Sequence, residues 1–581
     1  MDDDTSIQDC CVLPEAIEAR TLEIGRDRRA YSRCFIHAGE VIIRNLPTAH
    51  TLFDEHQRER CSRCLSTTRR QFQNSNNKNS LLRCGGCKQA WYCSRECQKL
   101  DFSLHRVECK EAPILFSLND GHGSSNSKLL VRNFLALRLK DGKVNNINCC
   151  QHRYDNDLRS HNVTIQCGKK HFEKLIQYSN GHLEDQEMID IRRAAQALWN
   201  QRKVLNKILM PDIDDGDDDT AETVVIHDRS ELEDQLERDM RRFRVNNFGV
   251  TDSLVRVIGG AVYTLGALLN HSCSPNCLLR YDLSSESSSQ RHEPPVMEVI
   301  AAQDIPIGEE LTHSYIELVS SKNSRISNLK QMYGFDCFCP RCCCRKKANS
   351  DKTSLKDVGS NNKNDEFLIW LPNNYRSLSP TELTTFILHN YNPATSNAII
   401  TNSTKDKSHL SPFDQDIIFK SLNKNDAVII EAIKVKQQQA KFFMMNGDLE
   451  DELSSLKEVV QILKQLTLAS GEEQLPLSLE LYQARCDRLG SLIVAGGQDN
   501  TKDALIECEH IVSFLCLALK HFPNHSLLGL QLFTLGDLYN SNGKSDEAQK
   551  TYTWARRNLQ ISQGNKSEMV MLLNEKIEYR S

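Results

Sequence analysis

The chain has 581 residues, of which 26% are charged and 39% hydrophobic, and its formal net charge is −5. This length is too great for one ordinary core and predicts roughly two to four domains of a soluble, globular protein. The small negative charge excludes a general electrostatic attraction to nucleic acid, so any such contact would need a local basic patch.

Cysteine is the residue in excess, with 23 copies. An odd number, in a chain without a secretory signal at its start, argues against a disulfide scaffold and favours metal binding in a reducing compartment. The longest mostly apolar stretch, 254–269, contains Arg256 and two adjacent glycines. It is shorter than the ~20 residues that a bilayer requires, so we expect an intracellular protein without a membrane-spanning segment.

The first half of the chain predicts strands, then a cysteine-rich segment, then helices. Residues 22–46 indicate short strands, because a turn at Gly39 leads into a buried apolar run. Residues 61–109 are rich in Cys and poor in aliphatic side chains, so metal must replace the missing core. Residues 127–207 show mainly helical spacing.

An acidic run follows at 212–219. It does not fit a calcium-binding EF-hand, because a register ending at Glu222 would put Pro211 and Ile213 at ligand positions. We interpret the run as a solvated, mobile loop.

The second half of the chain returns to strand-like runs at 250–315, followed by a polar linker at 349–364. After 425, apolar residues recur every three or four positions, and Asn/Gly turns separate the helices. Paired helices of this kind indicate a tetratricopeptide-like stack. A plain helical bundle is the alternative, because no strict period of about 34 residues is visible.

Eight residues with metal-ligand spacing lie in the cysteine-rich segment. They form the pairs Cys61-x2-Cys64, Cys84-x2-Cys87, Cys93-x3-Cys97 and His105-x3-Cys109. Eight ligands fill two closed tetrahedral Zn²⁺ sites and leave no open position, which indicates a structural role. Spacing alone does not assign the ligands to the two ions.

The pattern resembles the MYND zinc finger, including the Trp-Tyr-Cys-Ser sequence that begins at Trp91. The resemblance implies cross-braced sites, with Cys61, Cys64, Cys93 and Cys97 around one ion and Cys84, Cys87, His105 and Cys109 around the other. It also implies partners such as proline-rich peptides. The segment is locally basic, with Arg69, Arg70, Arg83, Lys88, Arg95 and Lys99, and this suggests a weak DNA contact, although solvated finger surfaces are often basic.

Three further motifs occur together later in the chain. They are Asn-His-Ser-Cys at 270–273, a Gly-Glu-Glu turn that leads to Tyr315, and Cys337-x-Cys339-x2-Cys342. Each motif alone also fits an ordinary turn or strand end. Together they resemble the SET domain, and SET with MYND is the combination found in the SET and MYND domain-containing protein-lysine methyltransferases.

This resemblance implies an α+β fold in which a split, β-rich SET domain contains the inserted finger and a helical insertion. A Cys-rich post-SET segment and an all-α tetratricopeptide-like domain follow. The implied boundaries are the N-terminal part of SET at 15–57, the MYND finger at 58–110, the helical insertion with its acidic loop at 111–243, the C-terminal part of SET at 244–318, post-SET at 319–348, an irregular linker at 349–424 and the helical domain at 425–581.

The resemblance also implies a function, transfer of a methyl group from S-adenosylmethionine to a lysine amine. This reaction depends mainly on alignment of the amine across a narrow channel. Tyr315 would orient the amine as the catalytic residue, and Phe248 and Tyr333 would line the lysine channel. The residues that would hold the cofactor are Gly25, Arg26, Asn246, Asn270, His271 and Phe335.

A third zinc site is implied at Cys273, Cys337, Cys339 and Cys342, which gives about three zinc ions per chain. Cys343 and Cys344 adjoin the last of these ligands and could compete for the metal.

One residue departs from the family pattern, because Asp27 stands where the second glycine of Gly-x-Gly is usual. A side chain there could crowd the cofactor, while Arg26 and Arg28 could offset this through charge-assisted contacts. The competing interpretation is therefore an inactive scaffold or transcriptional adaptor. For the enzyme we expect lysine-bearing histone or non-histone protein substrates, a monomeric state, and a location in both cytoplasm and nucleus.

Overall fold

The computed structural model describes residues 17–21, 28–67, 81–115, 125–138, 164–165, 172, 175, 177, 183–209, 228–283, 293–342, 427–469, 479–520, 522 and 524–578. The chain divides into two compact units. The first comprises Met1–Asn270, Cys277–Thr312 and Met332–Gly334, and the second comprises His271–Asn276, His313–Gln331 and Phe335–Ser581.

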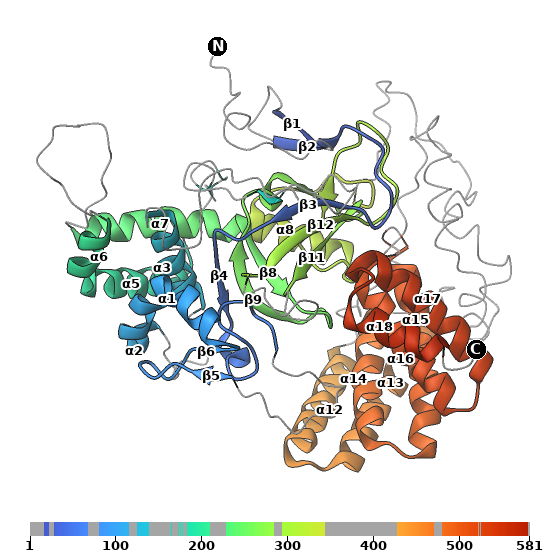
Figure 1. Cartoon of the computed structure of the whole chain (residues 1–581). Helices are drawn as coiled ribbons and strands as arrows, with labels where there is room; N and C mark the ends of the chain where they lie inside the picture. Colours follow the sequence, from blue (N-terminus) through green and yellow to red (C-terminus); the bar gives the residue numbers. More distant parts are fainter. Residues whose placement is uncertain are drawn as a thin grey trace, which may run out of the picture. The chain divides into compact units, whose positions relative to one another are not determined.

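Small twisted sheets form the centre of the first unit (Figure 1). One has the strand order β11-β12-β3-β7 and another the order β4-β9-β8; all their pairings are antiparallel except β3 with β7. A hairpin pairs β1 with β2. The strands are β1 (Ile17–Thr21), β2 (Arg28–Ser32), β3 (Val41–Asn45), β4 (Ala49–Leu52), β7 (Thr164–Ile165), β8 (Asn247–Thr251), β9 (Val257–Val262), β11 (Cys277–Asp282) and β12 (Val296–Ala301).

Strand β12 shows why this sequence forms the middle of a sheet. All six of its residues are buried, and five of them are apolar. The exception is Glu298, whose carboxylate binds Arg44 at 3.1 Å and Arg280 at 2.7 Å on the two neighbouring strands. A buried carboxylate of this kind is tolerated only when it is paired.

Helices pack around a second core in the same unit (Figure 1). Apolar side chains of α3, such as Leu130 and Phe134, meet Ile191 and Leu198 of α5 in this core. A capping box at Glu184 and Glu187 begins α5. The helices are α1 (Arg95–Lys110), α2 (Ala112–Leu115), α3 (Ser125–Arg138), α5 (Asp185–Asn200), α6 (Arg202–Leu209) and α7 (Arg229–Asn246).

The second unit is mainly helical. From α12 onward each helix packs on the next along the chain, which is the arrangement that a helical stack requires. Gly529 and Gly536 allow α16 to approach α17, because a Cβ atom at Gly536 would lie 2.5 Å from the ring of Tyr552. The C-terminal helices are α12 (Ala427–Asn446), α13 (Leu449–Ala469), α14 (Leu479–Ala495), α15 (Gln498–Ala518), α16 (Ser526–Ser541), α17 (Ser545–Gln563) and α18 (Glu568–Glu578).

The structure confirms the predicted mixture of helix and sheet, the cysteine-rich finger segment and the C-terminal helical region. Several predictions lie outside the described residues, namely those for Gly25, Arg26, Asp27, the acidic run 212–219, the linker 349–424, Cys343 and Cys344. Among the described helices, none combines the length and apolar character needed to cross a membrane.

Candidate metal centres and the His271–Tyr315 cluster

The first group of possible metal ligands comprises Cys61, Cys64, Cys93 and Cys97, whose sulfur atoms all lie within 4.8 Å of one another. Cys93 follows the short strand β6 (Trp91–Tyr92), which pairs with β5 (Leu82–Arg83). Ser94 caps α1 by accepting a hydrogen bond from the Cys97 amide at 3.1 Å, so Cys97 lies on the first helical turn. Hydrogen bonding with Cys61 lowers the pKa of Cys93 to about 7, which favours the thiolate that metal binding requires.

The second group comprises Cys84, Cys87, His105 and Cys109. His105 Nε2 lies 3.4 Å from the sulfur of Cys84 and 3.6 Å from that of Cys87. Burial opposes ionisation of Cys87, but His105 and the backbone amides of Gln89 and Ala90 together lower the pKa of Cys87 to about 6. A Cβ atom at Gly86 would lie 2.6 Å from the Cys109 sulfur, so this turn needs glycine for the ligands to converge.

A buried ionic network that sequence reasoning missed adjoins these two groups. Glu108 lies one helical turn after His105, and its carboxylate is 3.3 Å from His105 Nδ1. Arg132 of α3 donates to Glu108 at 2.6 and 2.8 Å and to Asp101 with two bonds of 3.0 Å. Burial alone would raise the pKa of Glu108, but Arg132 holds that pKa far below its usual range, so the carboxylate stays ionised. The only available signal was His-x2-Glu on one helix face.

The third group comprises Cys273, Cys337, Cys339 and Cys342, with all four sulfur atoms again within 4.8 Å. Cys273 and Cys342 are 3.5 Å apart at sulfur. Hydrogen bonds with Cys273 and Cys337 lower the pKa of Cys342 to about 7. Each of the three groups thus offers four buried or half-buried sulfur or imidazole donors, a set that suits a closed tetrahedral Zn²⁺ site.

His271, Tyr315 and Phe335 are brought together in the second unit. The ring centroid of His271 lies 5.4 Å from that of Tyr315 and 6.2 Å from that of Phe335. The Tyr315 amide donates to His271 Nδ1 at 3.0 Å. Burial lowers the pKa of His271 to about 4, so the ring is neutral near pH 7.

The hydrogen bonds of His271 also fix its tautomer. Because Nδ1 accepts the Tyr315 amide proton, the remaining ring proton resides on Nε2, which lies 3.2 Å from the Cys273 sulfur. The imidazole therefore connects the backbone of Tyr315 to a ligand of the third group. His271 lies on the short strand β10 (Asn270–His271), which pairs with β13 (Thr312–His313), and Tyr315 follows β13 by two residues.

Four of the residues predicted to contact the cofactor or line the channel lie in the described part of the first unit. Asn270 donates to Glu310 at 3.0 Å. Glu310 ends the Gly-Glu-Glu motif, to which sequence reasoning assigned no role of its own, and it also pairs with Arg29 at 3.2 Å. Asn246 is buried, and its side chain donates to the Arg242 carbonyl at 2.8 Å. The Phe248 ring packs on Tyr263 with centroids 5.8 Å apart.

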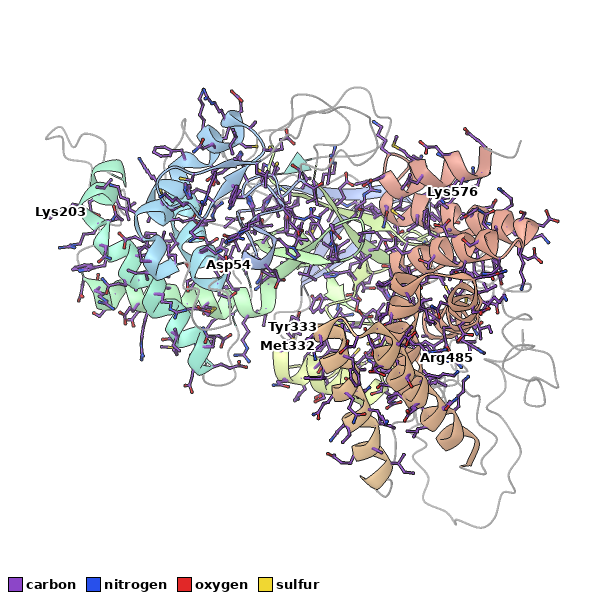
Figure 2. The ribbon with its side chains drawn as sticks, turned by 90° about the horizontal axis from the view of Figure 1, so that it is seen from below. Asp54, Lys203, Met332, Tyr333, Arg485 and Lys576 are labelled. Atoms are coloured by element: carbon purple, nitrogen blue, oxygen red, sulfur yellow. The ribbon has the colours of Figure 1, made fainter. Side chains whose placement is uncertain are left out.

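The fourth of these residues is Tyr333. It is beside Met332 at the end of α8 (Lys322–Tyr333; Figure 2). Burial raises the pKa of its hydroxyl.

The MYND finger family matches residues 61–109. The zebrafish protein named N-lysine methyltransferase SMYD2-A is 27% identical over 57% of this chain and 62% of its own length. Histone-lysine N-methyltransferase ASHR1 of Arabidopsis thaliana is 26% identical, over 58% of this chain and 56% of its own length. Human histone-lysine N-methyltransferase SMYD3 is 25% identical, over 53% of this chain and 57% of its own length.

The chain therefore contains a match to the MYND finger and is similar, over more than half of its length, to lysine methyltransferases of the SET and MYND domain-containing family. The finger match begins at the first and ends at the last of the eight predicted finger ligands. The chain aligns with about three fifths of the length of these curated relatives.

Proposed function

We propose that the protein is an S-adenosylmethionine-dependent protein-lysine N-methyltransferase that acts on histone or non-histone proteins. The observation that carries this proposal is the cluster of His271, Tyr315 and Phe335, together with the names of the relatives. Neutral His271 anchors the Tyr315 backbone, so the phenol is held on a fixed segment where a lysine amine could be oriented.

The proposed roles of the other residues follow the family pattern. Asn270, His271, Asn246, Phe335, Gly25 and Arg26 would contact the cofactor, which supplies the methyl group, and Phe248 and Tyr333 would line the lysine channel. Aromatic walls suit the alkyl stem of lysine and stabilise positive charge nearby.

Zinc is the proposed occupant of the three cysteine clusters, with about three ions per chain. We further propose proline-rich peptides as partners of the finger, a weak DNA contact, a monomeric state, and a location in cytoplasm and nucleus. Elemental analysis would check the metal, and a count of two zinc ions would remove one of the proposed sites.

The enzymatic proposal is tested by binding and turnover of labelled S-adenosylmethionine with a panel of histones and lysine peptides. Tyr315→Phe should reduce turnover by at least about tenfold, which corresponds to about 1.4 kcal/mol in the barrier. Tyr552→Phe is a matched control, because that hydroxyl donates to Asp537 within the C-terminal helices.

Different failures of this test have different meanings. A protein that binds no cofactor at millimolar concentration would contradict the enzymatic proposal and favour the adaptor function. Equal turnover by wild type and Tyr315→Phe would leave the activity in place but remove Tyr315 from its role.

A further inference from the structure

Arg341 lies between two ligands of the third cysteine cluster and joins three separate parts of the second unit. Its guanidinium is buried and donates to the carbonyl oxygens of Cys273, Leu318 and Ala518, each at 3.1 Å. Cys273 is two residues after His271, and Leu318 is three residues after Tyr315. One side chain therefore holds both segments of the His271–Tyr315 cluster and the end of a C-terminal helix.

The third partner of Arg341 is a helix terminus. Ala518 is the last residue of α15, and the surrounding residues 514–519 are buried. The last carbonyls of a helix have no partner within the helix and carry its negative dipole end, so a cation that donates to one of them is stabilising. Arg341 supplies that donor from the metal-binding loop.

The charge of Arg341 is matched to the cysteine cluster. Within the described residues its hydrogen-bond partners are neutral carbonyls, so no carboxylate offsets its charge. Four thiolates and one Zn²⁺ carry a net charge of about −2. Arg325, which is fully buried, lies 3.9 Å from the Cys342 sulfur and provides a second positive charge beside the same cluster.

The guanidinium of Arg341 is buried beside the cluster, so its positive charge is most favourable when the neighbouring sulfur atoms are thiolates, which is the state that metal binding requires.

We infer that Arg341 is a positioning residue that couples metal loading of the Cys273–Cys342 cluster to the C-terminal end of α15. A loaded cluster favours the buried guanidinium, and the guanidinium fixes the helix end. Because such coupling is reciprocal, disturbing either side weakens the other by the same factor. The inference rests on the proposed zinc site and is independent of methyl transfer.

The first experiment measures metal retention by the full-length protein. Wild type, Arg341→Lys and Arg341→Met are equilibrated with graded zinc chelator, and alkylation of each cysteine is mapped by mass spectrometry. In Arg341→Met, the four cluster cysteines should become open to alkylation at a chelator concentration at least about tenfold lower than in wild type. This is the usual effect of losing a group that supports metal ligands. Arg341→Lys keeps the positive charge but loses the planar guanidinium that donates to three carbonyls, so its effect should be intermediate.

The matched control is Arg488→Met. Arg488 is also a buried arginine of the second unit, but it pairs with Glu507 and Asp503. The Arg488→Met variant should leave alkylation of the cluster cysteines unchanged. Unchanged alkylation in Arg341→Met, or an equal increase in Arg488→Met, would overturn the inference.

The second experiment works in the opposite direction and does not depend on an Arg341 variant folding. Cys337→Ser removes one cluster ligand and leaves the finger intact. Backbone hydrogen exchange at 511–519, the end of α15, should then accelerate by about tenfold or more, while exchange in α12 stays at its wild-type rate. Loss of zinc without acceleration at 511–519 would overturn the coupling, whether or not the protein transfers methyl groups.

Discussion

The arginines beside the two kinds of metal-binding region are satisfied in different ways. In the finger region, Arg132 donates four hydrogen bonds to the carboxylates of Asp101 and Glu108. At the Cys273–Cys342 cluster, Arg341 donates to three backbone carbonyls. Both side chains are buried, so each depends on its partners to offset the loss of water.

Arg132 therefore supports a metal site by orienting a ligand, whereas Arg341 supports one by its charge. The charge of Arg132 is neutralised by its two carboxylates, and its influence on a metal passes through Glu108 and the orientation of His105. The charge of Arg341 has no such carboxylate among the described residues, so it acts directly on the neighbouring thiolates. Variants of the finger network test this distinction.

The largest effect is expected for Arg132→Met. It leaves Asp101 and Glu108 buried without their cation, and the loss of one partner from a buried ion pair typically costs about 3–5 kcal/mol. Urea unfolding, followed by tryptophan fluorescence, should show this decrease in the free energy of unfolding. Arg241→Met, which removes a half-exposed pair with Glu237, should cost about 0.5 kcal/mol. Equal effects of the two variants would contradict the role of Arg132.

A smaller and more selective effect is expected for Glu108→Gln. The amide keeps the shape of the carboxylate but weakens the hydrogen bond to His105 Nδ1, so metal affinity of the Cys84–Cys109 group should fall by about 10–100-fold. Chelator competition with mapped cysteine alkylation should show no change at Cys61 or Cys273.

Glu111→Gln is the control for this prediction. It changes a buried carboxylate at the end of the same helix whose partners are Asn200 and Gln201. A similar loss of affinity in Glu111→Gln would mean that helix stability, and not the orientation of His105, controls the metal.

The ligand groups and their support differ in how far sequence could predict them. Ligands recur at spacings of two to four residues, because neighbouring side chains on one turn must converge on one ion. The C-terminal helices could be predicted equally well, because their apolar residues recur every three or four positions within each helix. The partners of Arg132 lie 24 and 31 positions away, and those of Arg341 lie up to 177 away, so only the folded chain brings them together.

Local sequence patterns also did not predict the hydrogen-bond partners of the predicted site residues. Asn246 was expected to contact the cofactor, and in the structure its amide donates to a carbonyl of its own helix. His271 was singled out for cofactor binding, yet its ring connects Tyr315 to Cys273. A motif identifies the residue type, whereas hydrogen-bond partners depend on tertiary packing. The assignments of Asn246, Phe248, Asn270, His271, Tyr315, Tyr333 and Phe335 remain predictions.

Acid should weaken the finger region through His50. Burial, followed by Arg132, lowers the pKa of His50 to about 4, and its Nε2 lies 2.6 Å from the Arg63 carbonyl. Between pH 6.5 and about 4 the unfolded chain binds a proton that the folded chain does not, so stability is lost as pH falls through this window. At pH 5.5 this amounts to about 1 kcal/mol.

His50→Gln tests this sign, because glutamine retains a donor for Arg63 but does not titrate. In saturating zinc, the decrease in unfolding free energy from pH 7 to pH 5.5 should be smaller in the variant than in wild type. Identical pH dependence would mean that His50 is not the group whose protonation is suppressed beside Arg132.

The smallest effect is expected for Tyr92→Phe, and it tests whether the Arg132 network reaches the first finger site. The Tyr92 hydroxyl donates to Asp101 at 2.9 Å, and Tyr92 immediately precedes the ligand Cys93. Asp101 keeps both bonds from Arg132 in the variant, so the stability loss should be about 1 kcal/mol. If the network also positions the first site, alkylation of Cys93 in chelator should accelerate while that of Cys84 does not. An unchanged rate at Cys93 would confine the influence of Arg132 to His105 and the second finger site.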